Sequence, residues 1–330
     1  MTQERFQENK TAMVKNTGSK FLMGLWLIAT AIGLIAIPAP SATTAAAMRQ
    51  KTFATPAAAV DALIAANRAN KMRKLLAILG PAGAKLIRSG DPIADKRGRE
   101  RFLAAYDQAH KFELDGQDKA ILIVGSEEWP LPIPLVRQHT GWRFDTKVGV
   151  EEILNRRIGR NELSVIEVCR AYVVAQHEYA ANRLGPSGSP EYAQHFMSTE
   201  GQRNGLYWPV KPNEEESPLG PLIARARAAG YSPRTPHAKP RPYYGYYFRI
   251  LTQQGKNAPG DVRNYVINGH MTGGFALIAY PAIYGDSGVM TFVVNQDGIV
   301  YQKNLGPATT HIAKQRTQYD PDPSWQASKP

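Results

Sequence analysis

The chain has 330 residues, of which 43% are hydrophobic, so it is long enough for two domains and apolar enough to bury a core. Its only cysteine, Cys169, excludes an internal disulfide and a cysteine-rich zinc site, and we expect it as a small core residue. The net charge of +12 comes from basic residues that are dispersed except at 156–160, so nucleic acid is not the expected partner.

Residues 1–47 have the three-part pattern of an export signal. The uncharged run at 21–37 follows Lys15 and Lys20, and the small residues at 45–47 offer a cleavage site. The run has 17 residues, at the short end of the ~17–25 that cross a bilayer, so a retained membrane anchor is the alternative. We therefore expect an exported protein of the periplasm or cell envelope, which contacts the membrane only through 21–37 if the signal is not cleaved.

Residues 52–148 are expected to form a first domain in which helices come before a small antiparallel sheet. Thr55 followed by Pro56 is typical of a helix start, and apolar residues at helical spacing continue well beyond it. Alternating apolar residues at 111–146 predict three or four antiparallel strands. The prolines at 130–138 favour an edge strand or an extended segment, because proline cannot donate to a ladder. This order of elements resembles the nuclear transport factor 2-like and cystatin-like folds.

Residues 149–318 are expected to form a second α+β domain that begins with a long helical stretch. Gly159 favours an interruption of this helix, because glycine costs roughly 1 kcal/mol in a helix interior, and Asn161 favours a new N-cap. The helix that follows, at 161–183, has an apolar stripe that includes Leu163.

The region 185–242 is rich in proline, glycine and serine, which predicts a long loop with short helices at 192–198 and 222–230. Several β-prone runs follow, separated by glycine, asparagine or proline, and they predict an antiparallel meander that packs on the helix 161–183. Residues 319–330 are expected to be a polar tail.

A hairpin is predicted where two apolar runs meet at Gln296, Asp297 and Gly298. An Asp-Gly pair adopts positive φ angles at low cost and is the strongest short hairpin signal in the chain. A catalytic carboxylate needs a partner held close to it, and none is near in sequence. We therefore interpret Asp297 as a turn residue.

The sequence predicts no catalytic residue, no cofactor and no metal site. Gly285, Asp286, Ser287 and Gly288 resemble the nucleophile motif of trypsin-like serine proteases, but the histidine segment and disulfides of that family are missing, so we expect a loop. The tryptophans Trp129, Trp142 and Trp208 favour core or sheet positions, with an aromatic pocket or glycan platform as the alternative.

The loop 195–208 is the preferred place for a polar binding site, because it combines charged, amide and aromatic side chains in a short segment. The alternative is a loop that is held in place by its aromatic residues. The candidate ligand-binding residues are His195, Glu200, Arg203, Asn204, Tyr207 and Trp208.

The C-terminal half is similar to the globular head of type IV pilin-like and pseudopilin proteins. The apolar helix that pilins carry directly before the head is missing, since the only apolar run of that kind is at 21–37. The matching residues are Gly245, Tyr246 and Tyr247, then Tyr265, Val266 and Ile267, then Gly288, Phe292, Asn295, Gly298 and Ile299.

Over nearly all of 52–325 the sequence is similar to an uncharacterised family of exported bacterial proteins, domain-of-unknown-function family 2950. This resemblance implies no activity. The segments that carry it are 129–136, 141–146, 151–163, 204–209, 242–251 and 288–306.

The sequence favours an exported, non-enzymatic envelope protein that acts by binding or assembly, with an envelope protein or a second copy as partner. The alternative is a periplasmic enzyme or small-ligand-binding protein. Its site would be the loop 195–208 or a pocket in the first domain.

Overall fold

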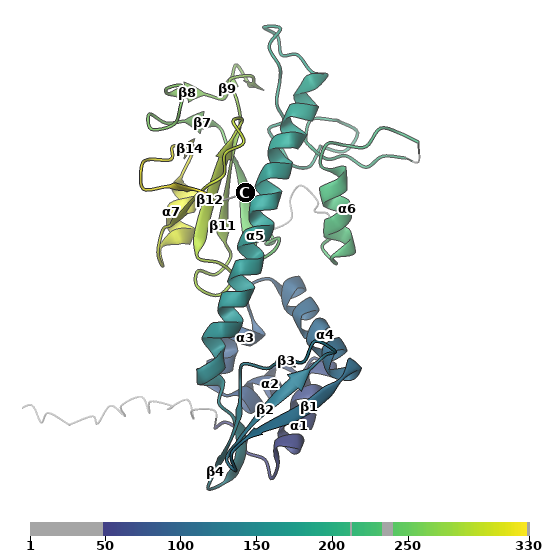
Figure 1. The fold of residues 1–330 in the computed structure, drawn as a ribbon. Coiled ribbons are helices and arrows are strands. Elements are labelled where there is room, and N and C mark those ends of the chain that lie inside the picture. Colours follow the sequence, from purple (N-terminus) through teal and green to yellow (C-terminus); the bar gives the residue numbers. More distant parts are fainter. Residues whose placement is uncertain (1–48, 212, 233–239, 329–330) are drawn as a thin grey trace, which may run out of the picture. The chain divides into compact units, whose positions relative to one another are not determined.

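The computed structural model describes residues 49–211, 213–232 and 240–328, and the predicted export signal lies outside these residues. The described chain has an α+β fold of helices and mostly antiparallel sheets (Figure 1). It contains two large hydrophobic cores and a small third one around Tyr231. No helix of this part is long and apolar enough to span a membrane.

The first core is built by short helices that precede a sheet. Thr55 caps the first helix, as predicted, because its hydroxyl accepts a hydrogen bond from Ala58 N at 3.1 Å. Asp91 caps the longest of these helices through Ile93 N and Ala94 N. The helices are α1 (Pro56–Arg68), α2 (Met72–Leu79), the 3₁₀ turn η1 (Pro81–Gly83), α3 (Ala84–Ile87) and α4 (Pro92–Gln108).

The sheet of this first part is antiparallel, with the order β1-β2-β4-β5 and a short β3 beside β2. Strand β4 lies between two neighbours, so the expectation of an edge strand is wrong for it. The prolines 132 and 134 fall in the extended segment before β4, where they interrupt no ladder. The strands are β1 (His110–Asp115), β2 (Lys119–Val124), β3 (Trp129–Pro130), β4 (Leu135–Gln138) and β5 (Gly141–Phe144).

Helix α5 (Thr146–Ala181) is one unbroken helix of 36 residues (Figure 1), so the predicted interruption at Gly159 and cap at Asn161 are wrong. Gly159 is exposed and Asn161 is buried, with its amide donating to Ser287 O at 2.9 Å instead of capping a helix. Packing on both sides of this point outweighs the cost of one glycine. Leu163 is 66% exposed and does not belong to the buried stripe, which contains Val165, Val168, Cys169, Tyr172 and Val173.

The second core lies around a five-stranded antiparallel sheet of order β15-β13-β12-β11-β6, which confirms the predicted meander on the long helix. Every residue of β11 is buried, because α5 and α7 (Thr309–Gln315) both pack against it. The strands are β6 (Tyr246–Leu251), β11 (Ala276–Pro281), β12 (Met290–Asn295), β13 (Tyr301–Asn304) and β15 (Gln326–Ala327).

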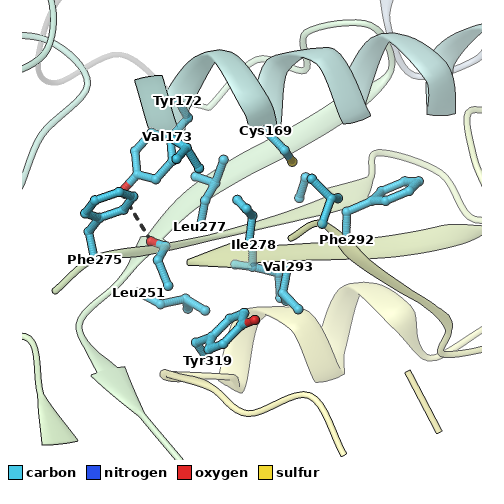
Figure 2. Close-up of a cluster of buried hydrophobic side chains, with 14 of the residues drawn as sticks. Cys169, Tyr172, Val173, Leu251, Phe275, Leu277, Ile278, Phe292, Val293 and Tyr319 are labelled. Atoms are coloured by element: carbon cyan, nitrogen blue, oxygen red, sulfur yellow. Dashed lines mark hydrogen bonds between the residues drawn. The ribbon is translucent and has the colours of Figure 1, made fainter. Parts of the chain in front are cut away.

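Figure 2 shows the side chains of Cys169 and Tyr172 directed from α5 toward this sheet. Cys169 is fully buried, as expected, and burial raises the pKa of its thiol to about 12. Because the thiolate is the reactive form, this cysteine is a core residue and not a nucleophile.

Two small sheets complete the second part. One has three strands in the order β14 (Gln318–Tyr319), β7 (Gln253–Gln254) and β8 (Arg263–Asn264), and the other pairs β9 (Val266–Ile267) with β10 (His270–Met271). The helix predicted at 222–230 is present as α6 (Gly220–Ala228).

Two local expectations are wrong. Residues 192–198 are not helical, because Tyr192 bridges Met271 and Met197 bridges Tyr207. The segment 319–330 is not a polar tail where it is described, since Trp325 is only 5% exposed. The aromatic residues of these segments add to the second core, and their apolar contacts decide the local conformation.

The hairpin between β12 and β13 confirms the turn at Asp297. Gly298 N donates to Asn295 O at 3.0 Å, and Gly298 has a φ of +77°. The Asn295 amide donates to the Asp297 carboxylate at 2.9 Å. The carboxylate of Asp297 thus accepts a hydrogen bond within its own turn.

Candidate functional site

The loop 195–208 is held together by hydrogen bonds within itself. Leu206 N donates to His195 O at 3.0 Å, and Tyr207 N donates to Phe196 O at 2.9 Å. Asn204 accepts from Thr199 N at 2.9 Å through its side-chain oxygen. This pattern is typical of a compact loop whose polar groups satisfy one another.

The aromatic and basic candidates of this loop also have partners. The guanidinium of Arg203 lies 5.3 Å from the ring centroid of Trp208 and 3.8 Å from the Glu214 carboxylate. Tyr207 is buried, and its hydroxyl accepts a hydrogen bond from Arg227 at 2.7 Å. These contacts stabilise the loop, and the ligand-binding role of the residues stays a prediction.

His195 and Glu200 are exposed at the surface of the loop. Among the six candidates, only His195 lines one of the two principal cavities of the described chain, and no other candidate joins it there. The structure therefore does not bring the six residues together around one space.

Ser287 is fully buried, and it lies in a loop, as predicted. Its hydroxyl accepts from Ile283 N at 3.0 Å and donates to Ile283 O at 3.1 Å. Across residues 49–211, 213–232 and 240–328, no three histidine, cysteine or acidic side chains are grouped to hold a metal ion.

A cavity of about 500 Å³ lies in the first part of the chain, between the helices α1, α4 and α5 and the sheet. We call it the arginine cavity. Its wall is mostly apolar, and five arginines line it together with one carboxylate. The apolar lining residues include Leu63, Leu79, Leu86, Phe102, Val124, Trp129, Leu131, Ile133 and Ile153, and the charged ones are Arg99, Arg101, Arg156, Arg157, Arg160 and Asp95.

The periodicity of two helices brings these charges to one space. On α4, Arg101 follows Gly98 and precedes Phe102, and all three line the cavity. On α5, the spacing of Arg156, Arg157 and Arg160 places them on neighbouring positions of one helix face. Arg101, Arg156 and Arg160 are exposed, whereas the leucines 63, 79 and 131 are buried, so the charged groups lie on the solvent side of an apolar cavity.

Small residues of α4 leave this space open. Ala94, Gly98 and Ala105 line the cavity at intervals that keep them on one side of the helix. A Cβ atom at Gly98 would meet only the Arg101 Nη2 atom, at 4.0 Å. The cavity thus depends on small side chains where larger ones would close it.

Three of the five arginines are engaged by groups of the protein. Arg156 pairs with Glu152 at 2.6 Å and lies over the Trp129 ring. Arg157 donates to the carbonyl oxygens of Lys85 and Leu86, each at 2.8 Å. The third, Arg99, donates to Asn70 Oδ1 at 3.1 Å.

The two remaining arginines, Arg101 and Arg160, have no side-chain hydrogen bond or ion pair with another described residue. Although Arg160 is exposed as a whole residue, partial burial of its guanidinium lowers its pKa, and the positive charges of Arg101, Arg157 and Arg156 lower it further. Its electrostatic surroundings are therefore positive, and an anion would be attracted to them.

Asp95 is the one acidic side chain that lines the arginine cavity. Both carboxylate oxygens accept from Ser89 N, at 3.0 and 3.2 Å. Burial raises the pKa of this carboxyl, against the smaller opposing effects of Ser89 and Arg157. The single negative charge of Asp95 is smaller than the summed positive charge of the five arginines that line the same cavity.

Sequence reasoning located the basic run at 156–160 but assigned it no site, and it overlooked Arg101. The helical spacing of arginines and small residues on α4 was the available signal. The sequence could not show that the arginines of α4 and α5 line the same cavity, because this depends on how the two helices pack in the fold.

A family model described as a protein of unknown function, DUF2950, matches residues 50–328, which is most of the chain. The chain belongs to the DUF2950 family. Searches of curated proteins and of solved structures found no match. The match to DUF2950 includes α4 and α5, the two helices that carry the five arginines of the cavity. The resemblance to pilin heads gains no support from a solved structure.

Proposed function

We propose that this DUF2950 protein is an exported, non-catalytic binding protein of the cell envelope, and that the arginine cavity is its ligand site. The cavity carries the proposal. Its volume of about 500 Å³ lies within the range of roughly 300–1,000 Å³ that is typical of small-molecule sites. Its mostly apolar wall with a few polar groups is also typical of such sites.

The apolar wall supplies the driving force for binding. Each Å² of apolar surface removed from water contributes roughly 25 cal/mol, so a ligand with an apolar body is favoured in this space. The loop 195–208 offers less, because Asn204, Arg203 and Tyr207 already contact other groups of the protein.

The proposal of export rests on the signal pattern at 1–47. Cell fractionation with N-terminal sequencing of the purified protein tests it. We expect the mature chain in the envelope fraction, starting near Met48, whereas a cytoplasmic protein that keeps Met1 would contradict export.

Assembly by a pilin-like route is not part of this proposal. The polymerising helix of a pilin is apolar, whereas the first half of α5 carries Arg156, Arg157 and Arg160 and lines the cavity. Binding fits these residues better than insertion into an apolar polymer core.

Binding of a neutral apolar dye, N-phenyl-1-naphthylamine, tests the site by fluorescence. We expect saturable binding by the full chain and at least a tenfold loss of affinity, ~1.4 kcal/mol, in Gly98→Leu, which extends a side chain into the cavity.

Gly159→Leu is the matched control. Gly159 is also a helix glycine, a Cβ atom there would have nothing within 4 Å, and it does not line the cavity. We expect this variant to bind the dye like the original chain. Absence of saturable binding, or equal loss in both variants, would overturn the proposed site.

A further inference from the structure

We propose that the arginine cavity takes an apolar chain ending in a single anionic group, such as an alkyl carboxylate, and that Arg101 and Arg160 bind this group. The inference rests on the proposed function and adds the chemical class of the ligand. It follows from which charges of the cavity already have partners and which do not.

The first step is the division of the five arginines. Arg156 and Arg157 are occupied, by the Glu152 carboxylate and by two backbone carbonyls, and Arg99 is bonded to Asn70. These three guanidinium groups have protein acceptors and need no ligand. Arg101 and Arg160 have none among the described residues.

The second step is the proximity of these two arginines. Arg101 and Arg160 both line the arginine cavity, Arg101 from α4 and Arg160 from α5. After burial, the positive charge of Arg101 is the largest cause of the lowered pKa of Arg160, which agrees with two guanidinium groups that repel each other. An anion between them replaces this repulsion with attraction. A guanidinium offers a planar fork of donors that matches a carboxylate or a phosphate.

The third step limits the size of the charged group. Of the five cavity arginines, two have no partner among the described residues. Nine large apolar side chains line the same space, among them Phe102, Trp129 and Leu131. A polyanion would leave most of its charge against this apolar wall, at a high desolvation cost. One anionic group beside an apolar chain satisfies both parts of the cavity.

The position of Asp95 agrees with this arrangement. Its carboxylate lines the cavity, but both oxygens are directed to Ser89 N, and Arg157 is the basic residue that acts on it electrostatically. Asp95 therefore leaves Arg101 and Arg160 available for the anionic group.

Isothermal titration calorimetry of the full chain tests the inference with three compounds of one chain length: decanoate, decyl phosphate and decanol. We expect at least one of the two anions to bind at least tenfold more tightly than decanol. The comparison of decanoate with decyl phosphate tells which anionic head is preferred.

The double variant Arg101→Gln/Arg160→Gln should bring the affinity for the anions down to that for decanol. Arg73→Gln/Arg137→Gln is the matched control, because it removes two exposed arginines that do not line the cavity. It should keep the preference for the anion. Thermal unfolding of each variant reports whether the fold is retained.

Equal binding of decanol and the anions by the original chain, or an anion preference that survives in the double variant, would overturn the inference. Binding of the neutral dye separates this failure from that of the proposed function. Dye binding that Gly98→Leu abolishes leaves the proposed function standing while the anionic ligand class is rejected.

Discussion

The arginine cavity and the loop 195–208 differ in what their charged side chains contact. In the loop, Arg203 lies against Trp208 and pairs with Glu214, and Asn204 bonds to the backbone of Thr199. In the cavity, Arg101 and Arg160 face an apolar space with no partner among the described residues.

This difference shows that the composition of a segment does not tell whether its charged side chains have partners in the fold. The loop is richer in residue types that bind ligands, yet these residues stabilise one another. Substitutions in the loop should therefore change stability, and substitutions of the unpaired cavity arginines should change binding.

The largest effect is expected from Leu206→Ala, which removes a fully buried side chain of the loop. We expect the free energy of unfolding to fall by about 2–5 kcal/mol, because the change leaves a cavity in the second core. Chemical denaturation measures this loss, and the affinity for the apolar dye should stay unchanged. A stable variant with impaired dye binding would assign the loop to the ligand site.

A smaller effect is expected from Asn204→Ala. The change removes the acceptor for Thr199 N and the donor to Gln202, and single hydrogen bonds contribute about 0.5–1.5 kcal/mol. Amide hydrogen exchange at Thr199 should become faster. His195→Ala is the control, since the exposed His195 side chain should contribute within about 0.5 kcal/mol. Loss of dye binding in His195→Ala alone would indicate that His195 and the loop 195–208 take part in ligand binding.

Asp95→Asn tests how the charge of the cavity affects the binding of an anion. Removing the one acidic side chain of the cavity should raise decanoate affinity two- to fivefold, on the order of 0.5–1 kcal/mol. Calorimetric titration of both chains gives this ratio. A fall in affinity would show that the carboxylate supports the anion site.

The same variant should alter the pH dependence of stability. Burial raises the folded-state pKa of Asp95 above 3.8, so the folded chain holds this proton more tightly than the unfolded chain does. Asp95 therefore lowers stability as the pH rises from 3.8 through the raised folded-state pKa. Chemical denaturation at pH 4 and pH 7 should show that the contribution of Asp95, a loss of unfolding free energy between these pH values, is absent from the variant. The same change in unfolding free energy in both chains would exclude Asp95 as a cause of that loss.

A similarly small effect is expected from Gly98→Ala. A Cβ atom there has open space, and alanine is about 1 kcal/mol better than glycine in a helix interior, so stability should rise by about 0.5–1 kcal/mol. Thermal unfolding measures this gain. Gly149→Ala is the contrasting change, because its Cβ would lie 2.2 Å from Pro132 O, and it should destabilise the chain. Destabilisation by Gly98→Ala would show that the cavity is closed at this point.

The sequence correctly predicted the structural features that depend on residues close together in the chain. The Thr55 cap, the turn at Asp297 and the meander of strands all follow from short-range preferences, and the structure has them. The break at Gly159 was wrong because one glycine costs less than the packing of a 36-residue helix gains.

The candidate site depended on information that no short segment contains. Arg101 and Arg160 are on different helices, and nothing in either neighbourhood shows that the other is near. Whether a charged side chain has a partner is also a tertiary property, which is why Arg203 was a candidate and Arg101 was not.

Photo-cross-linking with a decanoate analogue that carries a diazirine on its alkyl chain tests the central claim most directly. The account predicts labelling of peptides that contain Phe102, Trp129 or Leu131, which excess decanoate suppresses and which is absent from Arg101→Gln/Arg160→Gln. Saturable labelling of the loop 195–208, or labelling spread over the surface that decanoate does not suppress, would contradict it.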